Sequence, residues 1–454
     1  MQTYPMTPGQ DIIFVQQKYS YNKAISNINM MMVFEFEVDE QLMKQALVLA
    51  IQRNQSASMR LCKENKQTRQ YFSDQLPENI TLEDLSNLSP EMAEETIERW
   101  GQKKFPKGSF DTQLYRAKLV RLPSQELAVY FCVSHLIFDA FALITMAGDM
   151  IGIYRALKQQ RPLPKASPSP LPVYQKQWDY LESPLLQEDI AFFEDLYSEE
   201  MEYHSLNGRG SSEYVDGKRY GTTIRLWQLK AGFIDLRIPA KLVRGVEQLA
   251  ERFQVPVQTF YMLALRNFMS KLDRSENITI NHTVARRGTL AQKRAGGTMV
   301  NSCLFQMRQT NDMSLEAALN SMATYQMKLY RHTEIPYNEI RKIIERKFKP
   351  PHMKGYSSIG LTFQPYAVSQ YPDMPIRLKR YNNGHTAMPI YITIMQVDAT
   401  GDLLCNYEYT KGFIKEESIH RFHRYQLAML EKIIDQPELT LQDLVDLPIP
   451  EPAS

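Results

Sequence analysis

One histidine and one aspartate, four residues apart, are the strongest candidates for chemistry in this sequence. The segment reads Ser134-His-Leu-Ile-Phe-Asp-Ala140, which places His135 four residues before Asp139. An imidazole with an unperturbed pKa of about 6.5 exchanges protons near neutral pH and can act as a general base. The alternative is a core histidine satisfied by a backbone carbonyl, because this spacing often occurs by chance. The residues alone leave both interpretations open.

Motifs for other frequent kinds of site are missing. The sequence holds no G-x-x-x-x-G-K phosphate loop, no G-x-G-x-x-G after a predicted strand and no H-E-x-x-H helix. The segment from Gly355 to Gly360 has the wrong spacing for a G-x-S-x-G nucleophile elbow, so we do not expect a serine hydrolase. The four cysteines are too far apart in sequence for a C-x-x-C pair, and each is expected to be a small buried residue.

The elements that position His135 follow from the pattern of apolar residues. Residues 126–135, ELAVYFCVSH, form a near-continuous apolar run of strand length, which is typical of a buried central strand. Apolar residues then recur with helical period from 141 to 157. His135 is therefore expected where the strand ends and the loop to the helix begins.

A proline-rich connector divides the rest of the chain. Residues 161–172, RPLPKASPSPLP, can neither continue a helix nor donate to a sheet ladder. Because strands and helices are mixed on both sides, we predict two α/β lobes, each with a sheet covered by helices, at 1–165 and 166–454. Further helices are predicted at 40–52, 239–253, 257–272, 315–331 and 415–434, and further strands at 278–284, 357–363, 390–397 and 403–409.

The composition is that of an ordinary globular protein. The 454 residues are 43% hydrophobic and 23% charged, which argues against a disordered, collagen-like or coiled-coil chain. A net charge of +2 gives no reason to expect a nucleic-acid partner. The apolar stretch 140–147 is well short of the roughly 20 residues of a membrane-spanning helix, and residues 1–10 have no signal-peptide features. We therefore expect a soluble, cytoplasmic protein without membrane contact.

The segment around His135 resembles the HHxxxDG signature of the condensation domains of nonribosomal peptide synthetases, which are related to chloramphenicol-acetyltransferase-like enzymes. His135 matches the second histidine and Asp139 the aspartate, whereas Ser134 replaces the first histidine and Ala140 the glycine. Further segments resemble landmarks of this family, in the family's order, over nearly the whole chain. They are TPGQ at 7–10, RNQSASMR at 53–60, YQKQW at 174–178, TVARR at 283–287, MVNS at 299–302, HTEIPY at 332–337 and GLTF at 360–363.

The resemblance implies an α/β fold of two chloramphenicol-acetyltransferase-like lobes in a V-shaped pseudo-dimer, with an active-site tunnel between them. It also implies an acyltransferase that joins an acyl donor thioester to an amine. The phosphopantetheine arm of a peptidyl or acyl carrier protein, or coenzyme A, would deliver the donor. The domain itself would bind no metal or diffusible cofactor, and we expect it to be a monomer.

The resemblance also implies roles for individual residues. His135 would accept the proton of the amine or donate a hydrogen bond to the tetrahedral intermediate. Asp139 would pair with Arg287 and hold the loop, and Ser134 would supply structural support. Ala140 would introduce strain of about 1 kcal/mol if the family's glycine has a positive φ there, or would narrow the channel.

Three further positions are assigned with less specific roles. Asn301 would order a loop or contact the pantetheine, although a turn-forming asparagine is an equally good interpretation. Gly360 and Thr362 belong to a strand that faces the channel in this family. Arg286 stands where the family has a glycine, directly before Arg287.

Three hypotheses for the function remain open at this point. The first is a condensation domain that forms an amide between a carrier-bound or coenzyme A-bound acyl donor and a carrier-bound amino acid, including a starter domain that precedes an adenylation domain. The second is a freestanding acyltransferase that acylates a small amine or alcohol. The third is a recruitment domain that has lost turnover, against which the retained His135 argues.

Overall fold

The computed structural model describes residues 2–199, 201–208, 214–215, 218–219, 229–348, 358–364 and 371–452. Within these ranges the predicted helices and strands are all present, with ends within two residues of the predicted ones. Residues 355 to 357, considered above for a nucleophile elbow and for the start of a strand, lie outside the described residues.

A five-stranded sheet carries the His135 segment. Its order is β14-β2-β7-β6-β5, antiparallel except for the pair of β5 with β6. All eight residues of β7 are buried, which confirms the predicted central strand. The strands are β14 (Ile376–Tyr381), β2 (Asn27–Phe34), β7 (Leu127–Ser134), β6 (Tyr115–Arg121) and β5 (Leu82–Asp84).

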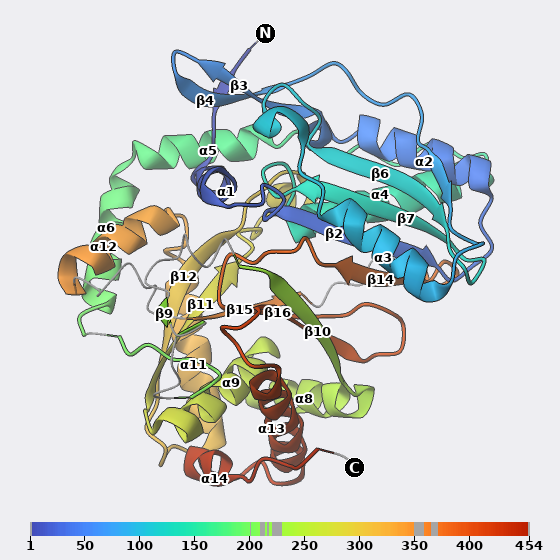
Figure 1. The fold of residues 1–454 in the computed structure, drawn as a ribbon. Helices are drawn as coiled ribbons and strands as arrows, with labels where there is room; N and C mark the ends of the chain where they lie inside the picture. Colours follow the sequence, from blue (N-terminus) through green and yellow to red (C-terminus); the bar gives the residue numbers. More distant parts are fainter. Residues whose placement is uncertain are drawn as a thin grey trace.

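A six-stranded sheet lies in the other half of the molecule, below the first sheet in the view of Figure 1. Its order is β10-β16-β15-β13-β11-β12, and β13 is parallel to both of its neighbours. One face is apolar and packs against helices α8, α9, α11 and α13 in a single core. The strands are β10 (Ala231–Ile238), β16 (Leu403–Thr410), β15 (Ile390–Met395), β13 (Ile359–Gln364), β11 (Asn277–Val284) and β12 (Asn301–Arg308).

Helices cover both sheets, and two short sheets complete the fold. In the first half α2 packs against α4, and α3 contacts β14 and β2. The short sheets are β1 (Tyr4–Pro5), β4 (Gln67–Phe72) and β3 (Met59–Glu64), and the pair β8 (Tyr214–Val215) and β9 (Lys218–Arg219). The helices are α1 (Pro8–Tyr19), α2 (Glu40–Gln52), α3 (Pro90–Gly101), α4 (Ala140–Lys158), α5 (Leu171–Leu181), α6 (Pro184–Leu196), α8 (Ala240–Phe253), α9 (Gln258–Asp273), α10 (Leu290–Arg294), α11 (Leu315–Tyr330), α12 (Tyr337–Phe348), α13 (Glu416–Asp435) and α14 (Leu441–Asp446), with the 3₁₀ turns η1 (Gln55–Ser58) and η2 (Pro106–Ser109).

Helix α4 is longer than the apolar stretch that the sequence suggested. It continues through Gly148 and Asp149 to Lys158, so the estimate of a stretch too short to span a membrane is wrong. By length and composition α4 is the one helix in the described parts of the chain that could cross a membrane. Its side chains pack into the core of the first half, with 56% of the most apolar window buried, as in the core helix of a globular domain.

Strand β14 crosses from the second half of the chain into the first sheet. It pairs antiparallel with β2, so Leu378 lies opposite Met32 although 346 positions separate them. Met395 and Leu404, at the ends of β15 and β16, also pack into the core of the first half. Residues 161–169 form no helix or strand, and α5 begins at Leu171. The division into lobes at 165 and 166 stays a prediction, and β14 is a strand that it places in the wrong sheet.

Candidate active site

His135 follows directly after β7, and its backbone is held from both halves of the chain. Its N–H donates to the carbonyl of Ser26 at 2.7 Å, and the hydroxyl of Thr298 donates to its carbonyl. Its ring is partly exposed, and Nδ1 is buried with no hydrogen-bond partner among the described residues. The interpretation of a core histidine whose ring is satisfied by a carbonyl is therefore not supported at Nδ1.

The surroundings of His135 favour its neutral form. Burial lowers the pKa of His135, the carboxylate of Asp139 opposes this, and the positive charge of Arg380 lowers the pKa further. A neutral imidazole has one nitrogen that can accept a proton. The ring is thus in the protonation state that a general base requires at neutral pH.

Asp139 and Arg287 form a buried ion pair that joins the two halves. Arg287 Nη2 donates to Oδ1 and Oδ2 of Asp139 at 2.8 and 2.9 Å, and both side chains are at most 1% exposed. Asp139 also accepts the N–H of Ala142 as the N-cap of α4, and Oδ2 accepts the N–H of Met299. Arg287 in turn donates to the carbonyls of 292, 295 and 297. Because every oxygen of the Asp139 carboxylate is used, the geometry supports a structural role.

Ser134 and Ala140 occupy the two positions that depart from the family signature. The Ser134 hydroxyl is buried and accepts a hydrogen bond from Gln17 of α1 at 3.1 Å, so it ties β7 to α1. Ala140 is the first residue of α4 and is not among the described residues with positive φ. The expected strain at Ala140 is therefore absent, because a residue at a helix start has ordinary helical backbone angles.

Restoring the family's glycine at Ala140 should weaken the fold. We expect Ala140→Gly to lower the free energy of unfolding by about 0.5–1 kcal/mol, since glycine loses more conformational freedom in a helix than alanine does. Urea denaturation followed by circular dichroism measures the change. A more stable Ala140→Gly variant would show that the methyl group is strained after all.

Arg286 explains why glycine suits its position in the family. Its φ is 51°, in the left-handed region that glycine adopts without cost and other residues rarely adopt. The Arg286 side chain is 5% exposed and pairs with Glu334. Burial lowers the pKa of Arg286 to about 10, so the guanidinium still carries its charge at neutral pH. This ion pair ties the end of β11 to the loop between α11 and α12.

Asn301 lies at the start of β12 and holds a loop. Its Nδ2 donates to the carbonyls of Thr333 and Ile335 at 2.9 and 2.7 Å. Both amide hydrogens are thereby used by the loop between α11 and α12. Of the roles considered for Asn301, the geometry supports the ordering of a loop.

Gly360 and Thr362 lie on β13, on the face of the six-stranded sheet that is turned away from its helical core. A Cβ at Gly360 would lie 2.4 Å from Cδ2 of Tyr391, so only glycine lets this ring cross β13. The Tyr391 hydroxyl hydrogen-bonds the Thr283 hydroxyl at 2.6 Å, and Thr362 also hydrogen-bonds Tyr391. These side chains form a polar strip along three neighbouring strands.

Three residues near this strip were missed from the sequence. Arg380 of β14 lies close enough to affect the pKa values of His135, Tyr391 and Glu408. It donates to Asn406 at 3.1 Å and lies 3.9 Å from the carboxylate of Glu408. Burial raises the pKa of Glu408, and Arg380 opposes the rise. The alternation of polar and apolar residues in β15 and β16 was a signal that could have pointed to Tyr391 and Glu408.

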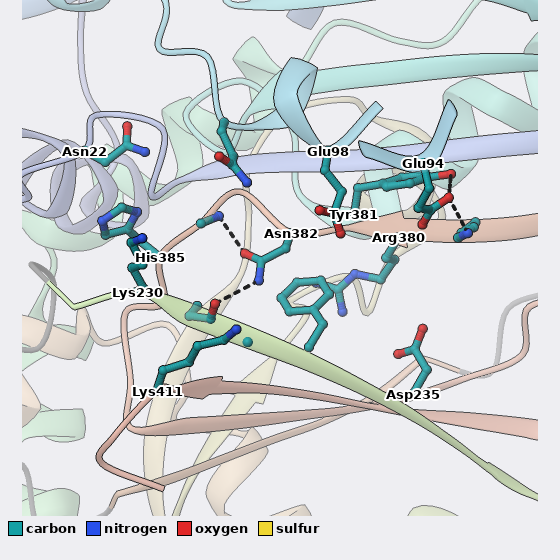
Figure 2. A pocket seen from close by; sticks show the side chains of 16 residues that line it. Asn22, Glu94, Glu98, Lys230, Asp235, Arg380, Tyr381, Asn382, His385 and Lys411 are labelled. Atoms are coloured by element: carbon teal, nitrogen blue, oxygen red, sulfur yellow. Dashed lines mark hydrogen bonds and ion pairs between the residues drawn. The ribbon is translucent and has the colours of Figure 1, made fainter. Parts of the chain in front are cut away.

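A cavity of about 520 Å³ opens between the two halves, beside Arg380 (Figure 2). It is bounded by α3 and β14 on one side and by β10 on the other. His135 is not among the described residues that line it, so a tunnel past His135 stays a prediction. No group of three or more metal-ligating side chains occurs in the parts of the chain that the structure describes.

Comparison with known proteins shows the family. The family model for the condensation domain matches residues 1–451. The chain belongs to the condensation domain family. Condensation domains are acyl-transferring enzymes that form amide bonds, and this activity fits the histidine and the buried ion pair described above.

Similar proteins extend the comparison. A plipastatin synthase of Bacillus subtilis (strain 168) is 23% identical over 446 residues, which is 97% of this condensation domain and 17% of that protein. Surfactin synthase subunit 1 of the same organism is 22% identical over 448 residues, 97% of this chain and 12% of that protein. The chain thus spans less than a fifth of the length of these two relatives.

Solved structures of condensation domains share the fold. The first condensation domain of the calcium-dependent antibiotic synthetase, in complex with a substrate analogue, has a TM-score of 0.82 at 14% identity and covers 99% of this chain and 100% of its own. A starter condensation domain of rhizomide synthetase in complex with C8-CoA has a TM-score of 0.80 at 15% identity, covering 97% of both chains. The predicted class of fold is confirmed.

Proposed function

We propose that this condensation domain joins the acyl group of a thioester to the amine of an amino acid held on a carrier protein. The donor thioester is carried by the phosphopantetheine arm of a second carrier protein or by coenzyme A. The observation that supports this most directly is the neutral, partly exposed imidazole of His135, whose buried Nδ1 has no hydrogen-bond partner among the described residues. The expected cytoplasmic location and monomeric state belong to the same proposal.

The proposed reaction needs alignment and the transfer of one proton. The amine nitrogen attacks the thioester carbonyl carbon, and the neutral imidazole of His135 takes the proton that the nitrogen loses. The C–S bond of the tetrahedral intermediate then breaks, and the thiolate leaves with that proton. Holding both substrates in one site contributes about 7–11 kcal/mol, and a general base contributes a factor of about 10²–10⁴ in rate.

The ion pair of Asp139 and Arg287 supports this role of His135 indirectly. It fixes the start of α4 against the loop 287–299, and Thr298 of that loop holds the carbonyl of His135. Both ends of the segment that presents the imidazole are therefore anchored. Catalysis depends strongly on such positioning, because small displacements of a catalytic group lower the rate markedly.

A starter domain is the form of the proposal that the comparisons favour. One similar structure is a starter condensation domain with C8-CoA bound, and that observation concerns the other protein. The test is to incubate the purified domain with an aminoacyl-loaded carrier protein and a series of acyl-coenzyme A or acyl-carrier donors. The intact mass of the acceptor carrier should rise by the mass of one acyl group with at least one donor.

The same experiment separates the rival functions. Acylation of a free amine or alcohol, with no acylation of the carrier-bound amino acid, would indicate a freestanding acyltransferase. No acylation under any donor, equal to that of His135→Ala, would indicate a recruitment domain without turnover. Either outcome contradicts the proposal.

The rate of amide formation should fall as the pH is lowered, with one midpoint below pH 6.5. Because burial lowers the pKa of His135, the ring stays neutral at pH 6.5 and loses its ability to accept a proton only below that value. The acceptor amine, with a pKa of about 8, adds a separate fall. We therefore expect kcat/KM to show both falls for the wild type and only the amine's fall for His135→Ala. A wild-type profile with the amine's fall alone would contradict the role of His135.

A further inference from the structure

The cavity between the two halves has an acidic end and a basic end. Figure 2 shows the carboxylates of Glu94, Glu98 and Asp235 apart from the cluster at the other end. At the acidic end the charges are largely satisfied, since Glu94 pairs with Lys379 at 2.7 Å and Asp235 accepts from an asparagine at 2.6 Å. Lys230, Lys411 and His385 form the basic end, together with Asn22, Asn382 and Gln102.

The two lysines of the basic end lie directly opposite each other. Ala231 pairs with Thr410 in the antiparallel ladder of β10 and β16, and the N–H of Lys411 donates to the carbonyl of Lys230 at 2.9 Å. Opposite residues of an antiparallel pair project to the same face, where like charges are destabilising. Both lysines are exposed, and neither makes an ion pair with a described residue. An anion between them would remove this repulsion.

His385 is held beside the lysines with an unused ring nitrogen. It is 9% exposed, it lines the cavity, and its Nδ1 has no hydrogen-bond partner within the described residues. Burial lowers the pKa of His385, and the charge of Lys230 lowers it further, which places that lysine close to the ring. A neutral imidazole can donate one hydrogen bond to an anion without adding repulsion to the lysine pair.

The loop that presents His385 is rigid. Gly384 has a φ of 92°, which requires glycine, and its N–H donates to Oδ1 of Asn382 at 2.6 Å. Asn383 accepts the N–H of His385 and donates to the carbonyls of Ile25 and Asn27 in the first half. The carbonyl of Gly384 accepts from Ala231, the neighbour of Lys230. The loop and the lysine pair are therefore fixed to one another.

We propose that Lys230, Lys411 and His385 form a binding site for the phosphate group of a pantetheine thioester. Two lysines and an imidazole from three segments converge on one end of the cavity, and lysine binds phosphate as a point charge. This inference rests on the proposed function, because the thioesters of that reaction carry phosphate on the pantetheine arm. The phosphate belongs either to a carrier protein or to coenzyme A.

The test follows the ring signals of His385 by NMR in the full domain. The sequence has eight histidines, so His385→Gln assigns the signal by its loss. We expect 4′-phosphopantetheine to shift this signal and to raise the pKa of His385, because a nearby anion favours the imidazolium. Pantetheine without phosphate should bind at least tenfold more weakly. Coenzyme A and a phosphopantetheine-loaded carrier protein, titrated separately, identify the source of the phosphate.

Charge-removing variants complete the test. The double variant Lys230→Gln with Lys411→Gln should bind 4′-phosphopantetheine at least tenfold more weakly, and Lys241→Gln, on the exposed face of α8, should bind it as the wild type does. Equal binding of pantetheine and 4′-phosphopantetheine, or unchanged binding by the double variant, would overturn this site. Amide formation by the wild type is measured independently, so loss of the phosphate site and failure of the proposed reaction give different results.

Discussion

Replacing His135 by alanine is expected to lower the rate of amide formation by a factor of about 10²–10⁴. The variant loses the neutral imidazole that takes the proton of the attacking amine, and keeps the ion pair that anchors the surrounding loop. Because the ring makes no hydrogen bond through Nδ1 to a described residue, its loss should leave the melting temperature unchanged. Single-turnover transfer to an aminoacyl carrier protein, followed by intact mass, measures the rate.

His420 provides the matched control for this variant. It lies on α13, which packs on the helical face of the second sheet, away from the His135 segment. We expect His420→Ala to transfer acyl groups at the wild-type rate. A His135→Ala variant that is as active as His420→Ala would remove the proposed base, whereas an inactive variant with a lowered melting temperature would show that His135 is structural.

Replacing Asp139 by alanine is expected to lower the free energy of unfolding by about 3–5 kcal/mol. The change leaves the Arg287 guanidinium buried without its counter-charge, and it removes the N-cap of α4. Removing one partner of a buried pair is costly because the remaining charge keeps its desolvation penalty. Urea denaturation measures the loss, and activity should fall only in proportion to the unfolded fraction.

Two further variants separate the parts of this effect. The double variant Asp139→Ala with Arg287→Met removes both charges, so it should be more stable than Asp139→Ala alone. Glu339→Ala breaks an ion pair with Lys342 at the surface and should cost at most about 1 kcal/mol. An Asp139→Ala variant with normal stability and no activity would mean that Asp139 acts in the reaction itself.

The sequence predicted the elements around His135 because their patterns are local. The apolar run of β7 and the helical period of α4 are each complete within a single short segment, and both elements were found within two residues of the expected ends. Burial of a central strand on both faces gives a continuous apolar pattern that needs no knowledge of its neighbours. The place of His135 at the strand end followed directly.

Strand β14 could not be predicted in the same way. Its sequence, IRLKRY, is half charged, and only its pairing with β2, far earlier in the chain, makes it a strand of the first sheet. Such pairings depend on tertiary context more than on local preference. Arg380 was missed for this reason, since nothing near it in sequence places it beside His135.

The contacts within the candidate site differ in how far they could be foreseen. The pairing of Asp139 with Arg287, 148 positions apart, was expected only from the resemblance to condensation domains. The positive φ of Arg286 and the helical start at Ala140 are backbone properties that no side-chain pattern reveals. The opposition of Lys230 and Lys411 required the register of β10 and β16.

The ring of His135 offers the most direct test of its proposed part in amide formation. An NMR titration of its signals, assigned with His135→Ala, should give a pKa below 6.5 that coincides with the lower midpoint in the pH profile of kcat/KM. A ring pKa of 6.5 or above, or a lower midpoint that persists when His135 is replaced, would contradict the proposal that a neutral imidazole takes the proton of the amine.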